Sequence, residues 1–127
     1  MRSRLGAGLL PLMMLLLLAA CDEGSDVGEG RRLVEGDINS GRRIIREQGC
    51  GACHRIPGVI AARGEVGPSL AGFSTRGYIA GRFPNRVPVL IEWITAAPLL
   101  DPYTAMPAFA LSRREARDVA AYLYTLD

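Results

Sequence analysis

The chain has 127 residues, of which 22% are charged, and a formal net charge of +2 at pH 7. This length suffices for one domain, with a hydrophobic core near the small end of what folds unaided. Two of the fifteen Arg lie in a segment that we expect to be removed, which leaves thirteen Arg against thirteen acidic residues. A near-neutral chain of this kind has no basic surface for nucleic acid, so no nucleic-acid partner is expected.

The first twenty residues have the pattern of an export signal. Two Arg precede an apolar run over residues 5–20, which is short for a transmembrane helix. The run ends in Leu-Ala-Ala-Cys, which resembles a bacterial lipoprotein processing site. The resemblance implies a signal peptide over residues 1–20 and a lipid on Cys21; an uncleaved anchor, or an ordinary signal peptide with Cys21 free, is the alternative. Each of these places the protein on the periplasmic side of the bacterial membrane, and Asp22 favours the inner membrane.

Residues 21–36 are rich in Gly and charge and contain few apolar side chains, which predicts a flexible tether. With the lipid expected on Cys21, this tether is lipid-anchored. About 15 such residues have a root-mean-square span of roughly 20 Å. A tether of this length would raise the effective concentration of the following domain near any partner in the same membrane.

The folded domain is expected over residues 37–127 and begins with a predicted helix over residues 37–48. Asp37 is a candidate N-cap for this helix. Its apolar side is predicted to comprise Ile38, Ile44 and Ile45.

The sequence Cys50-Gly-Ala-Cys53-His54 follows this helix and is the attachment signature of c-type haem. Two thioether bonds hold the edge of the macrocycle against one short turn. The adjacent His54 is then placed beneath the ring as the proximal iron ligand.

The spacing of Gly41 and Ile45 ahead of this motif, together with Val-Ala-Ala-Tyr-Leu at residues 119–123, resembles class I cytochrome c. The resemblance implies an all-α fold in which the first and last helices cross around one covalently bound haem c. Gly41 and Tyr122 occupy the positions where these helices meet in the family. Ile45 stands where the family usually has an aromatic residue.

Gly-Pro-Ser-Leu at residues 67–70 resembles the family's segment on the proximal side of the haem. The resemblance implies that the Pro68 carbonyl accepts a hydrogen bond from Nδ1 of His54, and that Leu70 packs against the haem. Metal-bound histidines nearly always have such a partner, which fixes the tautomer and the ring orientation. A proline that only begins a helix is the simpler interpretation of Pro68.

In the middle of the domain, the sequence predicts a short helix within residues 72–82, a turn at residues 83–88 and a mostly apolar helix over residues 89–96. Three polar or aromatic side chains here could contact a haem propionate or could simply pack or face solvent: Tyr78, Arg82 and Trp93.

Met106 is the only Met left once the signal peptide is removed. It lies within residues 97–107, whose prolines rule out a continuous helix. Ala-Met-Pro resembles the family's distal-ligand segment, which implies that Met106 is the second axial ligand of the iron. A loop methionine that only packs is the alternative.

The last predicted helix covers residues 113–125. Ser112 is its N-cap, and Glu115 three residues later completes a capping box. Its inward side is predicted to include Ala116, Val119, Ala120, Leu123 and Tyr122.

Two other interpretations of the Cys pair fail on the residues available. Structural zinc requires four ligands, and the only other Cys or His residues are His54 and Cys21. Cys21 is remote and is expected to carry a lipid, so at most three ligands are available. A thioredoxin-like pair lies near a βαβ pattern, which this chain lacks, and would leave the adjacent His54 without a role.

His54 and Met106 together would fill both axial positions of the iron, which favours a single-electron carrier over an enzyme. If Met106 is not a ligand, the alternative function is that of a haem enzyme or sensor. A further alternative is a fixed electron-entry subunit of a membrane complex. Segments between residues 78 and 107 are similar to small cytochromes c associated with bacterial haem-copper oxidases. That resemblance implies donation to a terminal oxidase of a respiratory chain, among other membrane-bound or periplasmic redox proteins.

Overall fold

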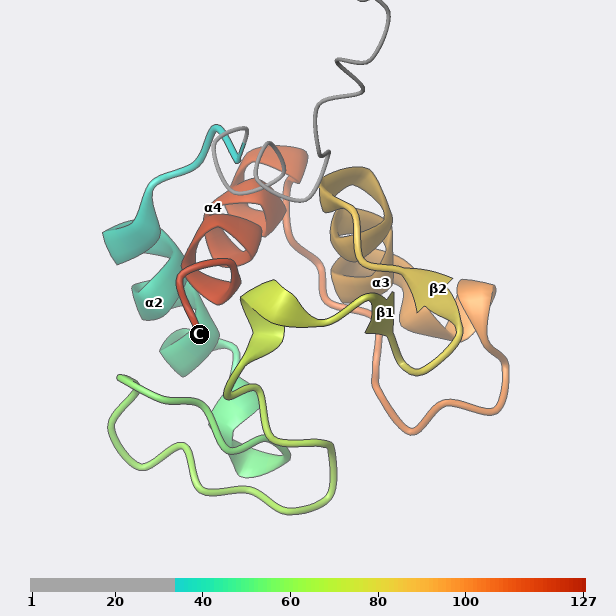
Figure 1. Cartoon of the computed structure of the whole chain (residues 1–127), viewed down its shortest axis with the longest axis horizontal. Helices are drawn as coiled ribbons and strands as arrows, with labels where there is room; N and C mark the ends of the chain where they lie inside the picture. Colours follow the sequence, from blue (N-terminus) through green and yellow to red (C-terminus); the bar gives the residue numbers. More distant parts are fainter. Residues whose placement is uncertain (1–33) are drawn as a thin grey trace, which may run out of the picture.

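The computed structural model describes residues 34–127 (Figure 1). Its helices are α2 (Ile38–Glu47), α3 (Val87–Leu100) and α4 (Arg113–Leu123), its 3₁₀ turns are η2 (Cys50–Ala52) and η3 (Phe73–Thr75), and its strands are β1 (Tyr78–Ile79) and β2 (Phe83–Pro84). The expected signal peptide, the lipidation site Cys21 and residues 21–33 of the tether lie outside the described residues. Between residues 34 and 127 no helix has both the length and the apolar character needed to cross a membrane.

Helices α2 and α4 cross in close contact, as Figure 1 shows. The contact is close because Gly41 has no side chain: a Cβ there would overlap the backbone carbonyl of Asp118 and lie 3.1 Å from Cβ of Tyr122. Asp37 reinforces the crossing, since its N–H donates to Oδ1 of Asp118 at 2.8 Å while its carboxylate accepts the Ser40 N–H. The crossing predicted at Gly41 and Tyr122 is therefore confirmed.

The buried side of α2 is narrower than expected. Ile44 and Ile45 are almost fully buried, but Ile38 in the first turn is 47% exposed. The apolar contact of this helix with the core thus begins at Gly41, one turn later than the sequence predicts.

The predicted start and inward side of α4 are confirmed. Oγ of Ser112 accepts the Glu115 N–H at 3.2 Å, and Oε2 of Glu115 accepts the Ser112 N–H at 2.8 Å. These hydrogen bonds lower the pKa of the Glu115 carboxyl below its ordinary value. The inward residues are all buried: Ala116, Val119, Ala120, Tyr122 and Leu123.

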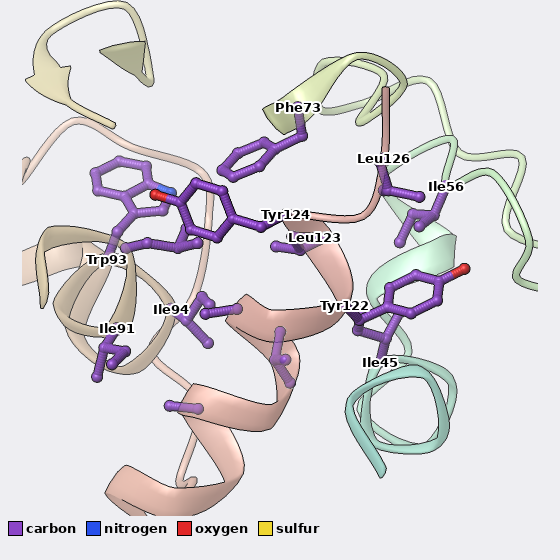
Figure 2. Close-up of a cluster of buried hydrophobic side chains, with 14 of the residues drawn as sticks. Ile45, Ile56, Phe73, Ile91, Trp93, Ile94, Tyr122, Leu123, Tyr124 and Leu126 are labelled. Atoms are coloured by element: carbon purple, nitrogen blue, oxygen red, sulfur yellow. The ribbon is translucent and has the colours of Figure 1, made fainter. Parts of the chain in front are cut away.

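Figure 2 shows the core as a cluster in which side chains of α2, α3 and α4 meet side chains from the loops. Phe73 packs edge-on against Tyr124, with ring centroids 5.7 Å apart. The Tyr124 hydroxyl donates to Oδ1 of Asn85, whose amide donates in turn to the carbonyls of Phe73 and Arg76. Burial raises the pKa of Tyr124 to about 12, so its hydroxyl keeps its proton at ordinary pH.

The prediction of a single short helix within residues 72–82 is wrong. Only Phe73–Thr75 form a 3₁₀ turn, and Tyr78–Ile79 then pair antiparallel with Phe83–Pro84. The connecting turn has φ of +50° at Ala80 and +69° at Gly81. Positive φ at two successive residues is the requirement of a tight hairpin turn and ends any right-handed helix.

Helix α3 begins at Val87, two residues before the predicted start, with Pro88 in its first turn, where a proline is tolerated. The helical geometry breaks at Ala96, where φ is −147°, and then resumes as far as Leu100. Pro98 explains the break, because it lacks the N–H that would bond the Ile94 carbonyl and its ring collides with that carbonyl.

The packed part of the chain begins slightly before the expected domain boundary at residue 37. Val34 packs against the core. A Cβ on Gly36 would lie 2.6 Å from the carbonyl oxygen of Arg117 on α4. The last three residues of the expected tether therefore lie on the folded domain.

Candidate haem site

A cavity of about 420 Å³ opens between the helices and the loops. Its wall is mostly apolar and includes core residues of α2, α3 and α4. Eight of the nine residues that the sequence offers for the haem site line this cavity, the exception being Arg82: Cys50, Cys53, His54, Pro68, Leu70, Tyr78, Trp93 and Met106.

The Cys-x-x-Cys-His segment is shaped by the end of α2. Gly49 adopts a left-handed conformation, with φ of +70°, and turns the chain directly into η2. The carbonyl of Cys50 then accepts N–H groups from both Cys53 and His54, at 3.2 and 3.0 Å. This tight turn brings both thiols and the imidazole to the same cavity.

A hydrogen bond to the Pro68 carbonyl orients the His54 ring. Its Nδ1 lies 2.8 Å from the carbonyl oxygen of Pro68. Because a carbonyl oxygen can only accept, the proton resides on Nδ1, and the lone pair of Nε2 is left for a metal. The hydrogen bond implied for Pro68 is thus present in the fold.

Gly67 completes the support of this imidazole. A Cβ on Gly67 would overlap the His54 ring, so the ring lies directly on the glycine backbone. The segment is held in place at both ends: the Gly67 N–H donates to the Cys53 carbonyl, and the Leu70 N–H donates to the Arg55 carbonyl, each at 2.8 Å.

The thiols of Cys50 and Cys53 are free and are not joined in a disulfide. Burial raises the pKa of the Cys50 thiol above its ordinary value. Redox-active Cys-x-x-Cys pairs depend on a lowered thiol pKa, so the environment of Cys50 is the opposite of a thioredoxin-like site.

Met106 is half-buried and reaches the cavity from the loop between α3 and α4. Its backbone N–H donates to Oγ1 of Thr104 at 3.1 Å. Thr104 also lines the cavity and was not predicted from the sequence. The contact could have been predicted from the position of this Thr two residues before a loop Met, because a Thr hydroxyl often bonds a nearby backbone group.

Arg76 also lines the cavity and was missed. Its guanidinium donates to the carbonyls of Ser69 and Ala71, at 2.5 and 2.7 Å, and lies 5.9 Å from the centroid of the Phe73 ring. An Arg in a Gly-rich loop is normally solvated, so the sequence carried no signal for it. Arg82 is not among the residues that line this cavity, and it pairs with Asp101 instead.

These groups fit one type of cofactor. Two free thiols spaced for thioether bonds, an imidazole with a free Nε2 and a thioether share one largely apolar cavity, which is the donor set of a covalently attached iron porphyrin. The fold and the site thus define a c-type haem protein.

The family model for cytochrome c matches residues 38–127, and the chain belongs to the cytochrome c family. The match supports a class I monohaem cytochrome with a mostly α-helical fold, in which haem c with its iron is bound covalently and transfers electrons to and from redox protein partners. The expected all-α class is confirmed, and residues 34–127 add only the two-stranded β1–β2 sheet and an isolated bridge between Arg55 and Arg63.

The c-type cytochrome SorU from Sinorhizobium meliloti is similar over 70% of this chain and 88% of its own, with 28% sequence identity and a TM-score of 0.49. No protein with a curated description matches this sequence.

Proposed function

We propose that this cytochrome c is a single-electron carrier whose haem is attached to Cys50 and Cys53 and whose iron is bound by His54 and Met106. The observation that carries the proposal is the convergence of these four side chains on one cavity. The bound haem supplies a reversible one-electron change at its iron.

The residues of this chain would hold the iron ligands in place and limit the access of water and substrates to the haem. Pro68 holds the proton of His54 on Nδ1 and directs Nε2 to the iron. If Met106 holds the iron together with His54, no coordination position would be left for a substrate, which favours a carrier over an enzyme. Leu70, Tyr78 and Trp93 form part of the wall that limits water around the ring.

The chain is further proposed to act on the periplasmic side of the bacterial inner membrane, held there by a lipid on Cys21, and to donate electrons to a terminal haem-copper oxidase. The lipoprotein-like processing site and the oxidase-like segments between residues 78 and 107 support this part of the proposal. A Cys21→Ala form should lose membrane attachment and show slower electron flux to membrane-embedded oxidase at equal protein concentration; an unchanged flux would contradict a role for the anchor.

The ligand assignment is tested with Met106→Ala. The oxidised wild type should show the weak near-infrared sulfur-to-iron band, and the variant should lose it and have a lower reduction potential, because a thioether ligand raises the potential. Leu111→Ala is the matched control, since Leu111 lines the same cavity and cannot bind iron. A wild type without this band would overturn the assignment of His54 and Met106 as iron ligands. The alternative function as a haem enzyme or sensor would then be favoured.

A further inference from the structure

Two separate segments form neighbouring parts of the cavity wall near Met106. One is the hairpin of β1 and β2, which contributes Tyr78, Ile79 and Ala80. The other is the methionine loop, defined here as residues 101–107, which contributes Thr104, Ala105, Met106 and Pro107. An ion pair joins the two: Nη1 of Arg82 lies 3.0 Å from Oδ2 of Asp101.

Asp101 organises the first half of the methionine loop. Its N–H donates to the Ala97 carbonyl and ends α3, while its Oδ1 accepts the Tyr103 N–H at 3.1 Å. Its own carbonyl accepts the Thr104 N–H at 3.1 Å, and Oγ1 of Thr104 accepts the Met106 N–H. Asp101 therefore holds the loop at two points: its carboxylate fixes the Tyr103 N–H, and its carbonyl is linked through Thr104 to the backbone of Met106.

Arg82 is held in position from the other side. Its N–H donates to the Ile79 carbonyl across the hairpin turn, and its guanidinium lies 5.8 Å from the centroid of the Phe83 ring. The Phe83 ring packs in turn against Trp93 of α3, with centroids 5.6 Å apart. The side chain of Asp101 is only 15% exposed, so this pair is shielded from solvent on its acidic side.

The nitrogen ligands that most often replace a lost Met are absent from this sequence. It contains one His, which is His54, and no Lys, so no other imidazole and no lysine amine exists to take the sixth position. If the methionine loop opens, the position passes to water or to an added ligand. The affinity for an added ligand then reports the fraction of molecules in which the loop is open.

We propose that Arg82 and Asp101 are positioning residues that hold the methionine loop closed and thereby keep Met106 on the iron. The proposal rests on the His54/Met106 ligation given under Proposed function. The pair lies outside the cavity wall formed by the ligands, so it acts through Thr104 and the loop backbone rather than by contact with the haem.

The test is an imidazole titration of the full-length oxidised holoprotein. Arg82→Gln should lower the apparent dissociation constant for imidazole about fivefold, the effect of losing one partly exposed ion pair on the opening equilibrium. Asp101→Asn should have a similar effect, because Asn removes the charge but retains an oxygen for the Tyr103 N–H. The double variant should match either single variant, since the same interaction is lost in all three.

Arg55→Gln is the matched control. It removes the 3.1 Å ion pair between Arg55 and Glu65, whose side chains are 58% and 81% exposed. This pair belongs to the loop after the haem turn, drawn in green in Figure 1, which lies apart from the orange methionine loop. This variant should bind imidazole as the wild type does. Denaturant unfolding of each variant separates loop opening from a general loss of stability.

The proposal is overturned if Arg82→Gln has the wild-type affinity for imidazole, if Arg55→Gln changes the affinity equally, or if the two single effects add in the double variant. The near-infrared sulfur-to-iron band of the wild type is recorded first. Its absence would defeat the proposed ligation, whereas its presence with unchanged imidazole affinities would defeat only the role of the Arg82–Asp101 pair.

Discussion

His54 is useful as a ligand in one tautomer and one ring orientation, and its immediate neighbours select both. The Pro68 carbonyl holds the proton on Nδ1, and the backbone of Gly67 provides the surface on which the ring lies. Neither contact uses a side chain, because proline contributes a carbonyl and glycine contributes the absence of a Cβ. Gly67 and Pro68 therefore act on His54 through the position of their backbone atoms.

Gly67→Ala should disturb the imidazole directly. The new Cβ would overlap the His54 ring, and the ring can move only by weakening its bond to Pro68. We expect about 1–3 kcal/mol of lost stability, as for overpacked cores, together with a shifted reduction potential. The measurements are denaturant unfolding of the holoprotein and potentiometry.

Gly77→Ala is the control for this change, because no atom lies within 4 Å of a Cβ at Gly77. Equal effects of the two substitutions on the potential would show that the close contact at Gly67 has no influence on His54.

At the scale of the elements, the crossing of α2 and α4 places the haem-binding turn. Helix α2 ends at Glu47 and leads through Gly49 into η2, so any shift of α2 against α4 would move Cys50 and Cys53. A second link joins α4 to the loop after the haem motif: the Tyr122 hydroxyl donates to the Pro57 carbonyl at 2.6 Å. Burial raises the pKa of Tyr122, so this donor keeps its proton.

Gly41→Ala should separate these two helices. Alanine favours a helix interior over glycine by about 1 kcal/mol, but the added Cβ overlaps the Asp118 carbonyl, a rigid backbone group. Overpacking of this kind costs about 1–3 kcal/mol or more, so a net loss of stability is expected in denaturant unfolding.

Asn39→Ala is the matched control, because Asn39 lies in the same helix and is exposed. It should leave stability unchanged or slightly raised. A Gly41→Ala protein at least as stable as the wild type would contradict the close crossing.

For the molecule as a whole, the haem cavity and the hydrophobic core are one region. Ile44, Ile45, Trp93 and Leu123 belong to the core and also line the cavity. A domain of this size buries a limited apolar area, so a cavity of about 420 Å³ lined by core residues removes contacts that the chain cannot replace. The cofactor is therefore a structural part of the domain as well as its redox centre.

The double variant Cys50→Ala/Cys53→Ala, which cannot attach haem, should lose cooperative unfolding. We expect near-native helix content by far-ultraviolet circular dichroism and a greatly weakened near-ultraviolet signal, because fixed aromatic packing depends on the filled cavity. Cys50→Ala alone retains one attachment site and should fall between the double variant and the wild type. A double variant that unfolds as cooperatively as the wild type would mean that the core is complete without haem.

Most of the individual elements could be predicted because their signals are local. The Asp37 and Ser112 caps, the break caused by Pro98 and the haem turn each depend on residues within about one helical turn. The segment 72–82 could not be predicted in this way. Ala80 has a conformation that alanine rarely adopts alone, and it is stabilised by the pairing of β1 with β2.

The sequence by itself determined the cofactor, because Cys50, Cys53 and His54 act within one turn of chain. It also led to the proposal of Met106 as the second iron ligand, since Met106 is the one Met among residues 34–127. Only the tertiary structure decided that Arg76 and Thr104 line the haem cavity, and that the Arg82–Asp101 pair joins the hairpin to the methionine loop outside it. The physical reason is that a local motif carries its own geometry. The walls of a cavity instead form where distant segments pack, and polar side chains such as these have no sequence pattern that distinguishes them from solvated ones.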